Sequence, residues 1–394
     1  MSNAWKIYML AIISFLVGTS EYIIAGILDK VASDVGVSVS AAGQLITIFS
    51  LAYAFGTPVV MALTARMERR RLLLYSLAVF ALGNFVAFAL PGYGFLIVSR
   101  IAVAVSAGVF FVASLTVASK LAPAGKQGSA IATLITGFSA ALIVGVPLGR
   151  VFASAYDWLL IFGALGILGL LSMLLILSSI PQSDGEKPVP LREQIALIKQ
   201  PKIAIGLTVS FLWVGGYSVA YTYISPYLLS VNKLTEQGVS AALFAFGIAS
   251  LIGSKIGGYS TDRWGVPRTL ASGLLFHTIA LLLLSLAGTS PVIVFPVLML
   301  WAFTAWTTGP TQQLNLMSLA PQASGIMLSL NSSVLQLGMA AGAGLGGVII
   351  QQVSLASISW VAAIVVILAG ALAVSTFGIS SSSRSRQEGI RSGN

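Results

Sequence analysis

The sequence predicts an all-α membrane protein with twelve transmembrane helices in two pseudo-symmetric six-helix bundles. Of its 394 residues, 57% are hydrophobic and only 8% are charged, a charge content too low for a water-soluble domain of this length. Apolar runs of about twenty residues recur along the whole chain, and such a run can cross a hydrocarbon core of roughly 30 Å. The two halves of the chain also share short motifs at a nearly constant spacing.

The first apolar run contains a glutamate and lacks a small-residue cleavage site, so we interpret it as a retained span and not as a signal peptide. Most later breaks contain proline, glycine or charged residues, which are typical of turns. The twelve spans are expected at residues 8–28, 42–64, 72–90, 94–119, 129–152, 157–179, 203–230, 238–258, 269–287, 291–317, 324–351 and 354–378.

The longest polar connection divides the spans six and six. We expect an N-terminal six-span bundle at 1–180, a cytoplasmic linker at 181–202, a C-terminal six-span bundle at 203–379 and a disordered cytoplasmic tail at 380–394. The motif Leu121-Ala122-Pro123 recurs 198 residues later as Leu319-Ala320-Pro321, and Gly149 corresponds to Gly347 at the same offset. A repeat of half the chain implies duplicated bundles with a site between them.

If the twelve spans cross the membrane in alternating directions, most lysine and arginine residues of the connections lie on one side. The other side carries only Lys30 and Lys233 in its loops, with Arg150 near a span end. By the positive-inside rule, we expect both termini to be cytoplasmic. This distribution explains the net charge of +10 without a nucleic-acid partner. The basic side carries Lys6, Arg66, Arg69, Arg70, Arg71, Lys120, Lys126, the four bases of the linker, Arg263, Arg268 and the tail arginines.

Glu21 stands in the middle of the first span, whereas the other ten acidic residues lie at run ends, in connections or in the tail. An ionised carboxylate at the centre of a bilayer costs at least a few kcal/mol, so intramembrane acids are usually functional. We therefore predict that Glu21 is a reversible proton site; a structural acid paired with a buried base or a backbone group is the alternative. Within spans, only Arg100 and Lys255 are expected as basic residues, and Lys255 lies near the cytoplasmic end of its span.

The turn after the eighth span contains Gly258, Asp262, Arg263, Gly265 and Arg268 at the spacing G-x-x-x-D-R-x-G-x-x-R. It resembles the signature turn of the major facilitator superfamily. We expect the glycine to allow close helix approach, and the Asp and Arg to form charge-assisted contacts that latch one conformation. The first-half turn keeps Arg66 but has Ala65 at the acidic position, where Glu68 is a substitute.

The fifth span contains Gly137, Gly145, Pro147 and Gly149, and resembles the motif of proton-coupled efflux members of that superfamily. Small residues permit close packing, and the proline removes a backbone hydrogen bond and bends the helix. A span built for packing alone is the alternative. Arg100 matches the basic residue of the antiporter motif in the fourth span, with snorkelling to the outer surface as the competing explanation.

Four further motifs together resemble the twelve-span drug:proton antiporter branch, and within it bacterial sugar-efflux and purine-efflux carriers. Those relatives usually have proline where Asp29 stands here, so the outer end of the first span is expected to differ. The motifs are Ser20-Glu21-Tyr22, Ala42-Gly43-Gln44, Ala62–Arg66 and Thr311-Gln312-Gln313.

Polar and aromatic residues within the spans are candidates for lining a substrate cavity. Tyr217 and Tyr221 share one helix face, whereas Tyr223 and Tyr227 are interpreted as interface anchors. His277, the only histidine, is interpreted as a hydrogen-bonded packing residue, with a proton relay as the alternative. The cavity candidates are Tyr22, Phe110, Trp213, Tyr217, Tyr221, Trp306, Gln312, Gln313, Asn331 and Gln336.

The predicted function is a proton-coupled antiporter that exports a small organic molecule of the drug, sugar or purine class by alternating access. Glu21 carries the proton, and Arg100 tunes it or acts as a gate. A proton-coupled uptake carrier or facilitator is the alternative. A channel would need a polar lining or charged rings, and a membrane-embedded enzyme would need a nucleophile–base or metal constellation. The resemblance implies a bacterial-type inner membrane, and we expect a monomer in the lipid bilayer, with no cofactor and no metal.

Overall fold

The structure is a computed structural model that describes residues 2–90, 92–123, 126–182 and 196–391. These residues form α-helices with short 3₁₀ and π turns, and twelve helices are long and apolar enough to cross a membrane. The all-helical prediction with twelve spans is therefore confirmed. Most of the expected linker, residues 183–195, lies outside the described residues, so the domain boundaries stay predictions.

The helices of the first half begin with α1, which Ser2 caps by accepting a hydrogen bond from the backbone N–H of Trp5. This cap starts the first helix earlier than residue 8, where we expected it. The elements are α1 (Asn3–Gly26), α2 (Leu28–Val35), α3 (Val39–Leu63), α4 (Arg69–Ala89), α5 (Tyr93–Leu121), α6 (Gln127–Ala140), the π-helical turn η1 (Ala141–Gly145), α7 (Val146–Ala155) and α8 (Leu159–Ser179).

The second half differs from the prediction in its first span. The expected helix at 203–230 breaks after Tyr221, because Pro226 lacks the N–H that would bond to the carbonyl of Thr222. The elements are α10 (Pro201–Tyr221), α11 (Ile224–Ser230), α12 (Glu236–Trp264), α13 (Val266–Leu286), α14 (Pro291–Leu319), η2 (Pro321–Ala323), α15 (Ser324–Gln352), η3 (Leu355–Ser357) and α16 (Ile358–Arg391).

The last helix is longer than expected. The last candidate span, Leu355–Ser375, agrees with the expected span at 354–378. Helix α16 itself continues to Arg391, through the tail that we expected to be disordered from residue 380. The serine- and arginine-rich sequence after Phe377 contains no proline that would end a helix. Residues 392–394 lie outside the described part of the chain.

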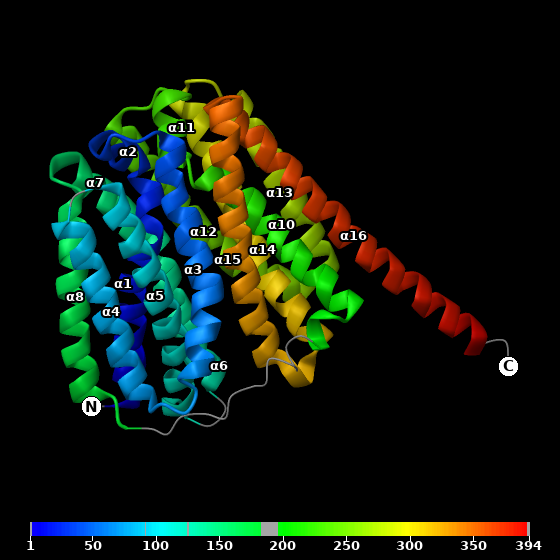
Figure 1. Ribbon diagram of the computed structural model, residues 1–394. Coiled ribbons are helices and arrows are strands. Elements are labelled where there is room, and N and C mark those ends of the chain that lie inside the picture. Colours follow the sequence, from blue (N-terminus) through cyan, green and yellow to red (C-terminus); the bar gives the residue numbers. More distant parts are fainter. Residues whose placement is uncertain (1, 91, 124–125, 183–195, 392–394) are drawn as a thin grey trace.

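The helices pack as two groups. In the first half, α1 packs on α5 and α6, α3 on α5, and α4 on α5 and α8; in the second, α10 packs on α15 and α16, α14 on α12 and α13, and α13 on α16. The repeated motif fits this arrangement, since Leu121 and Leu319 are the last residues of the 29-residue helices α5 and α14. Across the two groups, α3 packs on α15, and α12 packs on η1 and α7 (Figure 1).

The two groups share a core at one end of the molecule only. We call this the closed end; it contains α2, α7, α11 and the start of α12, opposite the start of α1 and the end of α16 (Figure 1). A continuous hydrophobic cluster there joins Leu28 and Trp158 of the first half to Tyr227 and Leu234 of the second. Toward the opposite end, each half has a separate cluster of its own. The halves therefore share a hydrophobic core at the closed end, in addition to the contact of α3 with α15.

Candidate functional site

Glu21 makes a direct contact between the two halves. It lies in α1 with only 7% of its surface exposed, and its Oε1 accepts a hydrogen bond of 3.0 Å from Nε2 of Gln336 in α15. The two residues are 315 positions apart. The carboxyl group therefore lies where the bundles meet, and its environment depends on both of them.

Several buried polar atoms of Glu21, Gln336 and other residues of α10 and α15 have no hydrogen-bond partner among the described residues. They include Oε2 of Glu21, Oε1 of Gln336, Oδ1 of Asn331 and Nε1 of Trp213. Unpaired buried polar atoms are costly, and most such atoms in folded proteins find a partner. Three acceptors and one donor are thus left for a proton, water or a bound molecule.

Aromatic rings from both halves lie near Glu21. Tyr22 follows it in α1, makes an edge contact with Phe138 at 5.9 Å between ring centroids, and lies close enough to Tyr217 and Tyr221 to interact electrostatically with them. The rings of Tyr217 and Tyr221 stack at 5.0 Å, as expected for two residues on one helix face. We call Glu21, Tyr22, Tyr217, Tyr221 and Gln336 the central site.

Trp301 supports the aromatic side of the central site. Its ring centroid lies 5.7 Å from that of Tyr217, and its Nε1 donates a 2.9 Å hydrogen bond to Nε2 of His277. Both Trp301 and His277 are fully buried. The histidine is therefore hydrogen-bonded in the packed interior, as the sequence indicated.

Four other predicted cavity residues do not contact Glu21. Phe110 is fully buried in the cluster formed by first-half helices alone. Gln312 donates to the carbonyl of Gly206 at 2.6 Å and to Ser210 at 3.1 Å, which ties α14 to α10. Gln313 and Trp306 are partly buried, and Trp306 packs against the large shared cluster. Of these four residues, Trp306 lies beside the hydroxyl of Tyr217 and so borders the central site. The structure shows none of the four in contact with Glu21.

Arg100 lies beside Glu21 but does not pair with it in the described structure. It is almost fully buried in α5, donates a 2.8 Å hydrogen bond to the carbonyl of Ser20, and lies 4.9 Å over the ring of Phe162. Snorkelling to the surface is therefore excluded by its burial. The expected role of Arg100 in tuning protonation of Glu21 stays a prediction. In this structure, such an influence would pass through the backbone of Ser20.

The glycines of α6 and α7 hold α1 in place. A methyl group built at Gly137 would overlap the backbone carbonyl of Ala11, and one at Gly145 or Gly149 would overlap side chains of α1. The π-helical turn η1 ends two residues before Pro147, which lacks an N–H for the regular helical bond. The motif therefore fixes the helix that carries Glu21.

The signature turn after α12 differs from our expectation in one respect. A side chain at Gly258 would meet no atom within 4 Å, so this glycine does not serve close helix approach. The close approach of α12 to α14 occurs at Gly253 and Gly257, whose added methyl groups would overlap backbone of α14. The helical period places Gly258 about 100° away from Gly257, on a face without a neighbour.

The charged residues of this turn are exposed. Arg263 donates a 2.9 Å hydrogen bond to the hydroxyl of Tyr259, and in the part of the chain that the structure describes no ion pair joins Asp262. Arg66, in the equivalent turn of the first half, is also exposed. The latch role of Arg66, Gly258, Asp262 and Arg263 stays a prediction.

The closed end contains interactions that sequence reasoning missed. Tyr223 and Tyr227 were interpreted as interface anchors, but both are fully buried, and Tyr223 donates to the carbonyl of Ala343 at 2.8 Å. The break after Tyr221 turns these rings inward. Arg150, which we placed near a span end, is a completely buried base within a span, beside Asp29 and Glu236, whereas the expected intraspan base Lys255 is exposed. The position of Arg150 within an apolar run was the sequence feature that could have identified it as buried.

A model of the Major Facilitator Superfamily matches residues 10–343. The chain belongs to this superfamily. It is therefore a secondary transporter and not an enzyme, and it is a multi-pass membrane protein. The family implies a small-molecule substrate and the lipid bilayer as surroundings.

Named relatives extend over nearly the whole chain. An uncharacterized MFS-type transporter of Bacillus subtilis, YbcL, is 57% identical, covering 94% of this chain and 95% of its own. The inner membrane transport protein YdhP of Escherichia coli is 31% identical, with coverages of 89% and 90%. A crystal structure of a bacterial homologue of the human lysosomal transporter Spinster, inward-facing and unoccupied, matches with a TM-score of 0.77 over 94% of this chain and 96% of that chain. At 15% identity, that likeness supports the fold.

Proposed function

We propose that this transporter is a proton-coupled antiporter of the drug:proton branch that exports a small organic molecule. The observation that carries the proposal is the hydrogen bond between Glu21 and Gln336, one residue from each half, beside a second carboxylate oxygen without a partner. Movement of the halves changes the surroundings of this carboxyl group. A group whose surroundings alternate in this way can take up a proton on one side and release it on the other.

The central site supports a substrate with an aromatic face and a hydrogen-bond donor or a positive charge. Tyr22, Tyr217 and Tyr221 provide ring surfaces, and Glu21 and Gln336 provide free acceptor oxygens. An aromatic site with one carboxylate is suited to organic cations. A neutral purine or sugar would use the same acceptors through hydrogen bonds.

The closed end supports an orientation for the cycle. Lys6, Arg66 and Lys126 belong to the opposite end, which the positive-inside rule places in the cytoplasm. The structure then corresponds to an inward-facing arrangement in an inner membrane, the location printed in the name of YdhP. Uptake in symport with protons, or facilitated diffusion, uses the same site and is the second candidate.

Proteoliposomes with an imposed pH gradient test the proposal. A screen of cationic drugs, purines and sugars should identify a substrate that moves uphill against proton flow in wild type. The Glu21→Gln variant should keep the fold and some substrate binding but lose this uphill transport, because the amide cannot carry the proton. Uphill transport by Glu21→Gln at the wild-type rate would contradict the proposal, and substrate movement in the same direction as protons would favour symport.

A further inference from the structure

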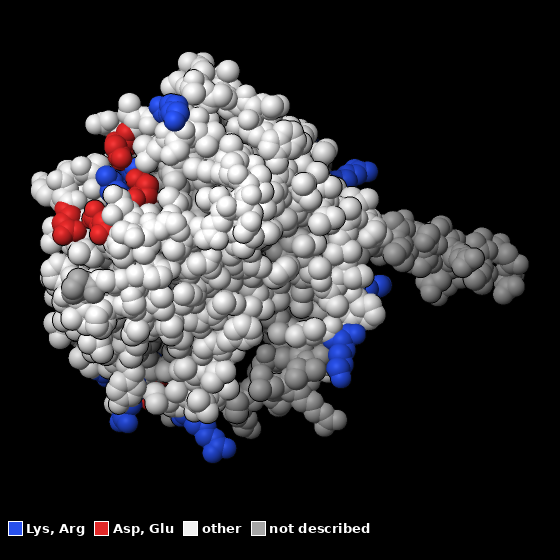
Figure 2. Space-filling model, turned by 45° about the horizontal axis from the view of Figure 1, so that its top comes forward, with Lys and Arg blue, Asp and Glu red and all other residues white. Residues whose placement is uncertain are grey.

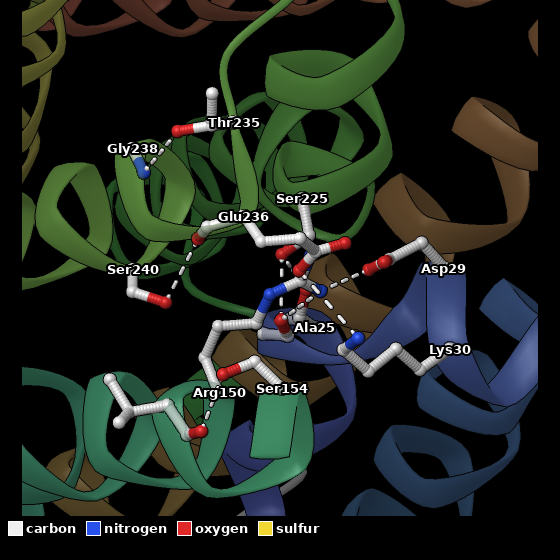
Figure 3. Close-up of polar contacts among 12 residues, drawn as sticks. Ala25, Asp29, Lys30, Arg150, Ser154, Ser225, Thr235, Glu236, Gly238 and Ser240 are labelled. Atoms are coloured by element: carbon white, nitrogen blue, oxygen red, sulfur yellow. Dashed lines mark hydrogen bonds and ion pairs between the residues drawn. The ribbon is translucent and has the colours of Figure 1, made fainter.

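Arg150 is the centre of an ion-pair network at the closed end. Its side chain is completely buried in α7, yet it donates to the carbonyl of Gly26 at 3.1 Å, to Asp29, and to Oε2 of Glu236 at 2.7 Å (Figure 3). Lys30 lies 3.6 Å from the same Glu236 oxygen. We call Asp29, Lys30, Arg150 and Glu236 the Arg150 network.

The network connects the two halves of the molecule. Asp29, Lys30 and Arg150 come from α2 and α7 of the first half, whereas Glu236 is the first residue of α12 in the second half. Figure 2 shows this end of the molecule, where acidic side chains gather around basic ones. Two pairs, Arg150–Glu236 and Lys30–Glu236, therefore cross the interface, and one pair, Arg150–Asp29, does not.

The two partners of Arg150 differ in burial. The side chain of Asp29 is 17% exposed and that of Glu236 is 41% exposed. A buried guanidinium without a counter-charge is strongly destabilising, so Asp29 is needed whether or not the halves separate. Glu236 can return to water at a small desolvation cost. The pairs with Glu236 are thus the ones that can form and break during transport.

Within the Arg150 network, the charges balance only when the halves are together. Together, two bases face two acids; apart, the first half keeps two bases and one acid, a net charge of +1, and Glu236 keeps its charge of −1. The neighbouring acids do not cross the interface, since Asp34 accepts from the indole of Trp158 and Asp157 accepts from the backbone of Leu159, all within the first half. Any contribution of charge to closure of this end therefore comes from the short-range contacts of Glu236 with Arg150 and Lys30.

We propose that Glu236 is the separable member of an ion-pair gate, and that its contacts with Arg150 and Lys30 hold the closed end shut. The inference rests on alternating access in the proposed function. A second mechanism of closure is packing alone, because Tyr223 fills the space beside Gly43 of the first half, and Ser225 donates to the carbonyls of Ala25 and Gly26 at 2.9 Å. Only the ion-pair gate depends on charge and on salt.

Distance measurements between two spin labels separate these mechanisms. The chain has no native cysteine, so Ser33→Cys in α2 and Gln351→Cys in α15 label only the closed end, at exposed positions in opposite halves. Glu236→Gln, which keeps the side-chain shape, should raise the ratio of separated to closed populations roughly tenfold, as expected for the loss of a charge-assisted contact. Glu236→Arg, which places a third base in the network, should raise the ratio further.

Two controls make the result specific. Asp157→Asn removes an exposed acid at the same end that contacts only its own half, and should leave the distances unchanged. Raising the salt concentration from about 50 mM to 500 mM should open wild type but not Glu236→Gln, because salt screens the partly exposed pair.

Unchanged distances in both Glu236 variants would overturn the ion-pair gate and assign closure to packing around Tyr223. Equal opening in Asp157→Asn would likewise overturn it, because the effect would then follow from surface charge in general. The measurement needs neither substrate nor a pH gradient. The transport experiments on Glu21→Gln can therefore fail without changing the result of the spin-label measurement.

Discussion

At the scale of single residues, the position of Glu21 between the halves allows its protonation to change the charge of the central site. The carboxyl group contacts Gln336 through one oxygen, and its other oxygen is buried without a partner among the described residues. A proton on this group removes a negative charge from the central site. Binding of a positively charged substrate and binding of a proton should therefore oppose each other.

This opposition predicts the pH dependence of substrate affinity. For a cationic substrate, affinity should fall as the pH is lowered, because protonation of Glu21 removes the charge that attracts the cation. A neutral purine or sugar should show a weaker slope. Calorimetry between about pH 5 and pH 8 measures the slope, and Glu21→Gln should flatten it. An identical slope in wild type and variant would remove Glu21 from the coupling.

At the scale of elements, α1 is positioned by the glycines of α6. Gly137 leaves no room for a side chain, because its added methyl group would overlap the carbonyl of Ala11. Backbone cannot yield as a flexible side chain can, so a larger residue must push the two helices apart. The spacing of these helices in turn fixes where Glu21 lies.

Gly137→Ala should therefore destabilise the protein by about 1–3 kcal/mol, the usual cost of overpacking. Gly258→Ala is the matched control, since its methyl group would meet no atom within 4 Å and alanine favours helix more than glycine does. Thermal unfolding in detergent should show a lower midpoint for the first variant and an equal or higher one for the second. Equal midpoints for Gly137→Ala and wild type would argue against tight α1–α6 packing.

The signature turn after α12 gives a second prediction at this scale. Asp262 is exposed in the present arrangement, in which the halves share a core only at the closed end. If Asp262 latches the opposite end when that end closes, Asp262→Ala should favour the present arrangement by about 1–3 kcal/mol. Label distances across the opposite end measure the shift. No change in that distance distribution would show that Asp262 is not a latch.

At the scale of the whole molecule, the distribution of charge predicts how the chain lies in the membrane. Ser33 belongs to the closed end, and Gly185 belongs to the expected linker, whose structure lies outside the described residues. A membrane-impermeant thiol reagent added to intact cells should label Ser33→Cys and not Gly185→Cys. The reverse pattern would show that the termini face outward.

Some of this protein was predictable from sequence because it depends on local properties. Span number follows from the length and hydrophobicity of each run, and Glu21 was identifiable because a carboxylate in an apolar run is rare. The stacking of Tyr217 on Tyr221 follows from the helical period. Helix boundaries failed where one residue, such as Pro226, broke a continuous apolar run.

By itself, the sequence determined the twelve helices, the uneven charge and the acid in the first span, since each is encoded within about twenty residues. Tertiary structure alone decided that Gln336 contacts Glu21, that Tyr223 and Tyr227 point inward, and that Arg150 joins Asp29 to Glu236. These contacts depend on how the helices of the two bundles pack against each other. Periodicity states which residues share a helix face, but not which distant face that helix meets.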